Sequence, residues 1–147
     1  MVNKYFNYFS LTTLIMAFIM ILYFSYLFLW PFNPLVPYPD HGVILKSEYC
    51  SGDTIGFKVH LKKQTDKSVE VHPAFIDGII FQLPAFSGDY KSGELNFWNH
   101  SIKVPDVIPA GNYYLTTTAI VKINHFRDIT YFNKSTPFSV IDCNRKN

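Results

Sequence analysis

A single hydrophobic stretch, residues 11–30, stands out near the start of the chain. Its sequence, LTTLIMAFIMILYFSYLFLW, has 20 residues without a charge, and its polar groups are only those of Thr12, Thr13, Ser25 and the tyrosines. A helix rises about 1.5 Å per residue, so this length matches the roughly 30 Å hydrocarbon core of a bilayer. Inside lipid, every backbone N–H and C=O must be hydrogen-bonded within the segment. The stretch therefore predicts a transmembrane helix.

Two other interpretations of this stretch are open: a helix buried in a protein core, and a signal peptide removed by cleavage. The rest of the chain is too short to surround 20 uncharged residues. A signal peptide usually has about 7–15 apolar residues followed by a triplet of small residues, whereas the exit here is bulky from Tyr26 to Phe32. We therefore expect an uncleaved signal anchor with aromatic side chains at its two ends: Tyr5, Phe6, Tyr8, Phe9, Trp30 and Phe32.

Beyond residue 42 the hydrophobic period changes to two. In residues 55–61, isoleucine, phenylalanine, valine and leucine alternate with glycine, lysine and histidine. This alternation predicts a half-buried strand. Similar patterns predict strands at about 43–49, 69–76, 94–104, 113–123, 129–132 and 137–141, with loops over 84–93 and 105–111.

The pair Asp77-Gly78 lies between two apolar runs, Phe75-Ile76 and Ile79-Ile80-Phe81. Aspartate and glycine tolerate the positive φ of a type I′ turn, so this sequence is typical of a β-hairpin. With seven or eight short strands and no second helical pattern, residues 42–143 are expected to form an all-β sandwich. A small closed barrel is the alternative.

Proline marks the boundary between the two parts. Residues 31–41 hold four of the nine prolines of the chain, and proline favours an extended chain. We expect a stiff linker of about 3.1 Å per residue that holds the following domain off the membrane. The expected organisation is a short cytoplasmic segment (1–10), a transmembrane helix (11–30), the linker (31–41), the β-sandwich (42–143) and a tail (144–147).

Charge divides the chain at the same place, because Lys4 is the only charged residue before Asp40. The positive-inside rule then places the N-terminus in the cytoplasm and the β-domain outside, in a periplasmic or extracellular space. Charged residues make up 16% of the chain and the net charge is +2. This small excess gives no electrostatic basis for binding nucleic acid.

One segment resembles a known superfold. Pro109-Ala110-Gly111-Asn112-Tyr113-Tyr114-Leu115 is similar to the loop-to-strand entry of immunoglobulin-like and fibronectin-type domains, and Phe138-Ser139-Val140 resembles their last strand. The resemblance covers residues 42–143 at the superfold level and is of the kind met in small membrane proteins of phages and bacteria. It implies an antiparallel sandwich in which Tyr113 is a tyrosine corner, with its hydroxyl bonded to a backbone group in residues 107–110. Unlike in true immunoglobulin domains, the cysteines lie near the ends of the domain.

Those two cysteines, Cys50 and Cys143, are each next to an expected strand end. In an oxidising compartment we expect them to form a disulfide that staples the first strand to the last. Two free thiols are the alternative.

The chain carries no recognisable catalytic or cofactor motif. It has no G-x-S-x-G, no phosphate-binding glycine loop and no paired carboxylate motif, so we expect neither an enzyme nor a cofactor. Five histidines are present, without H-x-H or H-E-x-x-H spacing. The one metal hypothesis that the pattern leaves open is a pair formed by His60 and His72, expected on successive strands.

The sequence favours a role in binding another protein. The hairpin region holds more apolar residues than one sandwich face buries, and the loop near residue 126 joins two strands at a sandwich end, where recognition is common. We therefore expect a non-enzymatic, membrane-anchored protein with an external immunoglobulin-like domain for binding a protein. A structural subunit of an envelope or virion assembly, which implies an oligomer, and a periplasmic metal-handling domain are the alternatives. The candidate interaction residues are Phe75, Ile76, Ile79, Ile80, Phe86, Phe126 and Arg127.

Overall fold

The computed structural model describes residues 2–29 and 33–143. The chain divides into one unit that contains the helix and another that contains the sheets. Among the described residues, one apolar helix precedes nine strands. This confirms the expected all-β class with an apolar N-terminal helix.

The helix, α1 (Val2–Leu29), is long and apolar enough to cross a membrane. Its apolar part, Tyr8–Leu29, has 22 residues and a mean hydropathy of 2.1, and about 1.5 Å per residue gives it the length of a hydrocarbon core. The hydroxyls of Thr12 and Thr13 donate to the carbonyls of Tyr8 and Phe9, at 2.7 and 2.9 Å. These bonds satisfy both hydroxyls within the helix, as a lipid environment would require.

The observed helix also differs from the expected one at its ends. It begins at Val2, so residues 2–10 are helical and continuous with the expected transmembrane helix. Trp30, residues 31–32 and the tail 144–147 lie outside the described residues, as do the side chains of Lys4, Tyr5 and Phe6.

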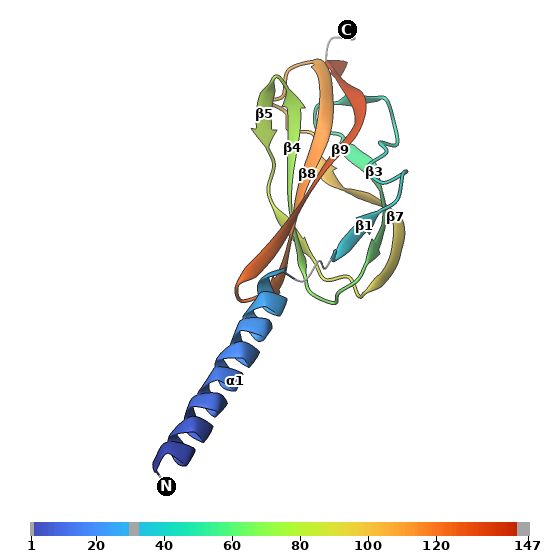
Figure 1. Cartoon of the computed structure of the whole chain (residues 1–147). Coiled ribbons are helices and arrows are strands. Elements are labelled where there is room, and N and C mark those ends of the chain that lie inside the picture. The colour runs from blue at the N-terminus through green and yellow to red at the C-terminus, as the bar shows by residue number, and fades with distance from the viewer. Residues whose placement is uncertain (1, 30–32, 144–147) are drawn as a thin grey trace. The chain divides into compact units, whose positions relative to one another are not determined.

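The β-domain has two sheets, which form separate layers in Figure 1. The smaller sheet has the order β1-β3-β7, and its neighbouring strands are antiparallel. The larger sheet has the order β2-β9-β8-β4-β5, with β6 also paired with β4. Its strand β2 runs parallel to β9, so the start of the domain pairs with its end. The strands are β1 (Leu35–Pro37), β2 (Glu48–Cys50), β3 (Thr54–Lys63), β4 (Val69–Asp77), β5 (Ile79–Gln82), β6 (Phe86–Gly88), β7 (Gly93–Lys103), β8 (Gly111–Asn124) and β9 (Arg127–Ile141).

The core lies between the two sheets. Successive side chains of a strand point to opposite faces, and the alternation expected around residue 57 places the inward ones in this core. The buried cluster takes its members from both sheets and from the loops at one end: Ile44, Tyr49, Ile55, Phe57, Phe75, Ile102, Val104, Ile108, Tyr113, Leu115, Phe138 and Val140.

The expected linker is part of the domain. Residues 35–37 form β1, in which Leu35 pairs with Lys63 and Pro37 with Leu61. Leu35 is only 4% exposed. The prolines therefore mark a short edge strand, where a missing N–H is tolerated, and the domain begins before residue 42.

Two further strands differ from the expectation. The region 84–93, expected as a loop, contains β6, which pairs with residues 69–71 of β4. The two strands expected at 129–132 and 137–141 are one strand, β9.

The hairpin at residues 77–79 is present, but its turn is not of type I′. Asp77 pairs directly with Ile79, and Gly78 has a φ of +68°. Among the described residues only glycines have positive φ, whereas a type I′ turn needs positive φ at two successive residues. Gly78 alone makes the reversal.

Candidate functional site

Adjacent isoleucines of β5 are the most exposed apolar residues of the hairpin. Ile79 is 66% exposed and Ile80 is 62% exposed. Phe75 and Phe81 form the pair that faces the core, so the next pair, Ile76 with Ile80, faces outward. β5 is the last strand of its sheet, which leaves its outer side without a neighbour among the described strands.

Tyr114 extends this apolar area across the sheet. Ile76 is opposite both Ile80 of β5 and Tyr114 of β8, and directly opposite residues of neighbouring strands lie on one face. The ammonium of Lys134 is 3.7 Å from the centre of the Tyr114 ring, which is a cation–π contact. We call the set formed by Ile76, Ile79, Ile80, Tyr114 and Lys134 the hairpin surface. Within it, Ile79 points to the opposite face of β5 from Ile80 and exposes its side chain beside the turn.

The structure separates the interaction residues expected from the sequence. Phe75 is fully buried in the core and Phe86 packs against it, so these two support the fold and do not present a surface. Ile76, Ile79 and Ile80 belong to the hairpin surface. Tyr114 and Lys134 were not anticipated, although Tyr114 follows the inward Tyr113 and its outward direction is implied by the alternation.

Phe126 and Arg127 do not belong to the hairpin surface, because they lie at the other end of β8. The hairpin surface includes Tyr114, near the start of β8, whereas these two residues follow the end of β8. Phe126 is exposed, and its backbone N–H donates to Asn124 Oδ1 at 2.9 Å. The seven expected residues therefore do not form one site.

A polar cluster lies on the smaller sheet, around His60 of β3. Its Nδ1 is 2.5 Å from Asp40 Oδ1, and its Nε2 is 3.2 Å from Glu94 Oε1. The imidazole also stacks on Tyr38, with ring centres 4.2 Å apart. A neutral imidazole has one N–H and donates to one carboxylate, whereas the protonated ring donates to both.

The same cluster includes His41, whose Nδ1 accepts the backbone N–H of His60 at 3.1 Å. Burial lowers the pKa of His41, against the opposing charge of Asp40. Desolvation acts to raise the pKa of Asp40, but the hydrogen bond from His60, a backbone hydrogen bond and the charges of His60 and Lys58 together outweigh it, so the pKa is lowered. The cluster therefore joins the segment 38–41 to β3 and β7 through polar contacts.

The metal pair proposed from His60 and His72 is not supported by the topology. β3 and β4 belong to different sheets, so these side chains do not face each other across neighbouring strands. His72 Nε2 instead contacts Glu70 Oε1 at 2.9 Å. In the cluster around His60 the carboxylates surround the imidazole and do not converge on a common point. Within the described part of the chain, no three His, Cys, Asp or Glu residues are placed to hold a metal ion.

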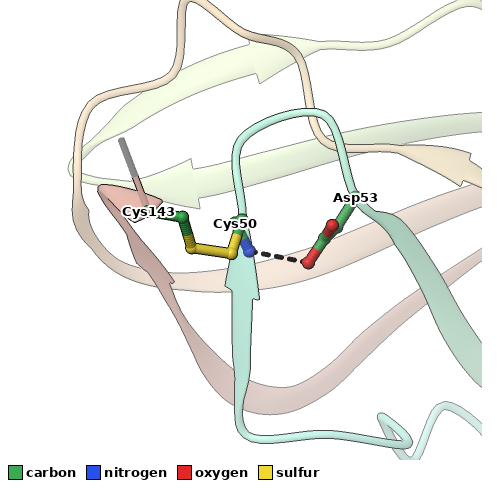
Figure 2. Close-up of a disulfide and its surroundings, with 3 residues drawn as sticks. All are labelled: Cys50, Asp53 and Cys143. Atoms are coloured by element: carbon green, nitrogen blue, oxygen red, sulfur yellow. Dashed lines mark hydrogen bonds between the residues drawn. A yellow bond between two sulfur atoms is a disulfide. The ribbon is translucent and has the colours of Figure 1, made fainter. Parts of the chain in front are cut away.

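The cysteines lie at disulfide distance, with their Cα atoms 5.6 Å apart and their sulfur atoms joined (Figure 2). The parallel pairing explains this, because it puts Cys50 level with Ile141, two residues before Cys143. Asp53 Oδ2 accepts the backbone N–H of Cys50 at 2.8 Å and fixes the turn that follows (Figure 2). The first and last strands of the larger sheet are thus stapled, as the sequence predicts.

Tyr113 has the partner expected of it. Its side chain is 2% exposed and its hydroxyl donates to the carbonyl of Pro109 at 2.9 Å, within the range 107–110. Burial and the nearby Asp77 raise the pKa of Tyr113, which keeps its hydroxyl protonated as a donor.

Comparison with known proteins gives no relative: no family model, no curated protein and no solved structure matches this chain.

Proposed function

We propose that this protein is anchored in a membrane by α1 and presents an immunoglobulin-like β-sandwich outside the cytoplasm, where the hairpin surface binds another protein without catalysis. The observation that carries the proposal is the exposure of Ile79 and Ile80 at 66% and 62%, because these consecutive residues present apolar side chains on both faces of the last strand of a sheet.

The anchor and its direction rest on the helix and on charge. The apolar part of α1 has the length of a bilayer core and no charged residue. Lys4 is at its N-terminal end, and the first charge after it is the acidic Asp40. By the positive-inside rule this arrangement favours an external β-domain. Compartments outside the cytoplasm are oxidising, and there the Cys50–Cys143 disulfide would persist.

The immunoglobulin-like assignment is supported by the contact between Tyr113 and Pro109. Two mostly antiparallel sheets with a buried core between them are common to many sandwiches, but a tyrosine that bonds back to the loop before its own strand is a specific feature of that superfold. The disulfide departs from the usual pattern, because it links two neighbouring strands of one sheet, β2 and β9, and does not join the two sheets across the core.

The hairpin surface has the composition of a protein-binding patch. Burying apolar area contributes about 25 cal/mol per Å², so two exposed isoleucines supply a useful driving force when a partner covers them. An aromatic ring and a cation next to them, Tyr114 and Lys134, are of the kind that gives an interface its direction and specificity.

A test uses the full-length protein in the membrane of its host. A photo-crosslinking amino acid at position 80 identifies what lies against the surface, and the double variant Ile79→Ser with Ile80→Ser is then compared with the wild type. We expect recovery of the crosslinked partner to fall at least tenfold. Phe132→Ser, at another exposed apolar position of the chain, is the matched control and should keep full recovery.

Equal recovery from the double variant and the wild type would contradict the proposal. Crosslinks only between copies of this chain would favour the alternative, a structural subunit of an assembly.

A further inference from the structure

The inward side chains of the smaller sheet are buried at one end and half-buried at the other. On β3, Ile55 and Phe57 are buried, whereas Val59 and Leu61 are partly exposed. On β7, Ile102 is buried, whereas Leu95 and Phe97 are partly exposed. These residues alternate correctly toward the interior, so one end of the sandwich lacks the apolar atoms that would cover them.

At this end the side chains leave a cavity of about 90 Å³ between the sheets. Apolar side chains from both layers line it, among them Val59, Leu61, Val71, Phe86, Leu95 and Phe97. At one end Lys63, which is 1% exposed, donates from its ammonium to the carbonyl of Tyr90. That bond gives the amine a partner, and the rest of the lining is predominantly apolar.

The strand beside this cavity has a free edge. β7 has 11 residues, and among the described strands it pairs only with β3, as the outer strand of its sheet in Figure 1. Its stretch LNFWNHSI, residues 95–102, has no proline and no charge. Natural proteins usually protect a long edge strand with prolines or charged residues. Without them, the unpaired N–H and C=O groups of the edge are a template for another strand. One of these groups is used locally, since the Ser101 N–H donates to Asn99 Oδ1 at 2.8 Å.

The cavity and the edge belong together. Leu95, Phe97 and Asn99 of β7 line the cavity from the smaller sheet, while Phe86 and Gly88 of β6 line it from the larger sheet. A strand added to β7 would therefore direct every second side chain into the space between the sheets.

We propose that β7 accepts an extended segment of another protein, which adds as a further strand and inserts an aliphatic side chain into the cavity. Backbone hydrogen bonds along β7 supply the pairing, and the cavity selects the side chain. A cavity of about 150 Å³ holds benzene, so about 90 Å³ suits a smaller group, such as the branched side chain of valine or leucine. This site is separate from the hairpin surface and does not depend on it.

Two other occupants fit less well. A long acyl chain needs more volume than the cavity has. A second copy of this chain, paired β7 to β7, would point its own Leu95 and Phe97 into its own cavity, so both cavities would stay unfilled.

The probe is a fluorescein-labelled peptide with alternating threonine and valine and a lysine at each end. It is added to the full-length protein in nanodiscs, with fluorescence anisotropy as the first readout and hydrogen–deuterium exchange as the second. We expect saturable binding and slower exchange of amides in β7. A peptide N-methylated at alternate residues, which cannot donate the pairing bonds, should bind at least tenfold more weakly, as should a peptide of the same composition with its valines in one block.

A protein variant tests the cavity itself. Ala119 of β8 lines it from the larger sheet, and Ala119→Leu should fill it and weaken peptide binding at least tenfold. The Ile79→Ser with Ile80→Ser variant should bind the peptide as the wild type does, so a failure of peptide binding at β7 can be told apart from a failure of partner binding at the hairpin surface. If Ala119→Leu does not fold, the two modified peptides still test whether β7 pairs with an added strand.

Several results would overturn the proposal. They are the absence of saturable binding, equal binding of the N-methylated peptide, protection on β5 in place of β7, and a dimer in which β7 is protected without peptide.

Discussion

Tyr113 and Tyr114 are neighbours with opposite roles. The Tyr113 ring is buried and its hydroxyl bonds to Pro109, while the Tyr114 ring faces outward under the ammonium of Lys134. A buried hydroxyl contributes through its bond, whereas the outward ring contributes through its face.

Tyr113→Phe should therefore lower the free energy of unfolding by roughly 1 kcal/mol, because it leaves the Pro109 carbonyl without this donor. Tyr114→Phe keeps the ring and should change stability little. Urea midpoints of the two variants, measured on the full-length protein in mild detergent, check this. A larger loss for Tyr114→Phe would mean that the strand is shifted by one residue.

His41 should make the stability depend on pH. Burial lowers its pKa below the ordinary value of 6.5, so as the pH falls below about 6.5 the unfolded chain binds a proton before the folded one does. Stability is then fully present above that pH and decreases as the pH falls toward the folded pKa, by at most about 1.4 kcal/mol per pH unit. Protonation at Nδ1 would also remove the acceptor of the His60 N–H.

Thermal melts of the wild type and of His41→Asn between pH 7.5 and 5 measure this contribution. The asparagine offers an acceptor that does not titrate, so the variant should show a smaller slope. An unchanged slope would assign the pH dependence to another group. The lowered pKa of Asp40 acts in a separate window, because its contribution is lost only as the pH falls below about 3.8.

The sequence predicts interaction partners that are near in the chain and does not predict those that are far apart in it. The acceptor of Tyr113 is four residues away, so the pattern around residue 109 contains it. The carboxylate of Glu94 is 34 residues from His60, and only the pairing of β3 with β7 brings them together. Sequence alone therefore could not place a carboxylate beside His60.

Among the elements, the parallel pair β2 and β9 has the largest energetic consequence. It positions Cys50 and Cys143, which are 93 residues apart, for a bond. Closing a loop of this size stabilises a domain by about 4–5 kcal/mol in the chain-entropy model.

Replacing both cysteines by serine should thus lower the free energy of unfolding by about 2–5 kcal/mol. The urea midpoint of the double variant should match that of the reduced wild type, since both lack the same link. An oxidised wild type with the midpoint of the double variant would show that the bond does not stabilise the native state.

Alternation predicted four of the five long strands, divided the longest one, β9, into two, and failed for the three-residue strands β1 and β6. β3, β4, β7 and β8 each have nine or more residues and display the period-two pattern. β1 and β6 have three residues each, too few for a pattern, and they depend on pairing with β3 and β4. Pro37 in β1 also favoured a linker, because proline lacks the N–H that a strand donates to its neighbour, although an edge strand tolerates this loss.

At the scale of the whole molecule, topology is the decisive prediction. Lys4 is the only lysine before residue 46, so an amine reagent that cannot cross membranes distinguishes the two sides. On intact cells with permeabilised outer layers, exposed lysines such as Lys46 and Lys67 should be labelled and Lys4 should not. Lys63 is buried and is the internal control for a folded domain. Labelling of Lys4 alone, read by peptide mass spectrometry, would reverse the orientation.

The candidate surface was predictable only in part. The sequence indicated an excess of apolar residues near the hairpin, but Phe75 and Ile80 are equally apolar and only the register of β4 with β5 separates the core residue from the surface residue. The free edge of β7 has no sequence signal either, since an edge is defined by the absence of a neighbour.

The disulfide also determines how the protein would respond to tension. When a membrane pulls on the helix while a partner holds the β-domain, the load enters the domain at about residue 33 and first reaches the three-residue β1. β1 can peel away, and the segment up to Cys50 can then extend by roughly 60 Å at about 3.5 Å per residue. Beyond Cys50 the load divides, because the Cys50–Cys143 bond closes the rest of the domain into a covalent ring. Each of the two arms that lead from the bond to the hairpin surface then carries only part of the force, so β1 would yield before the strands inside the ring.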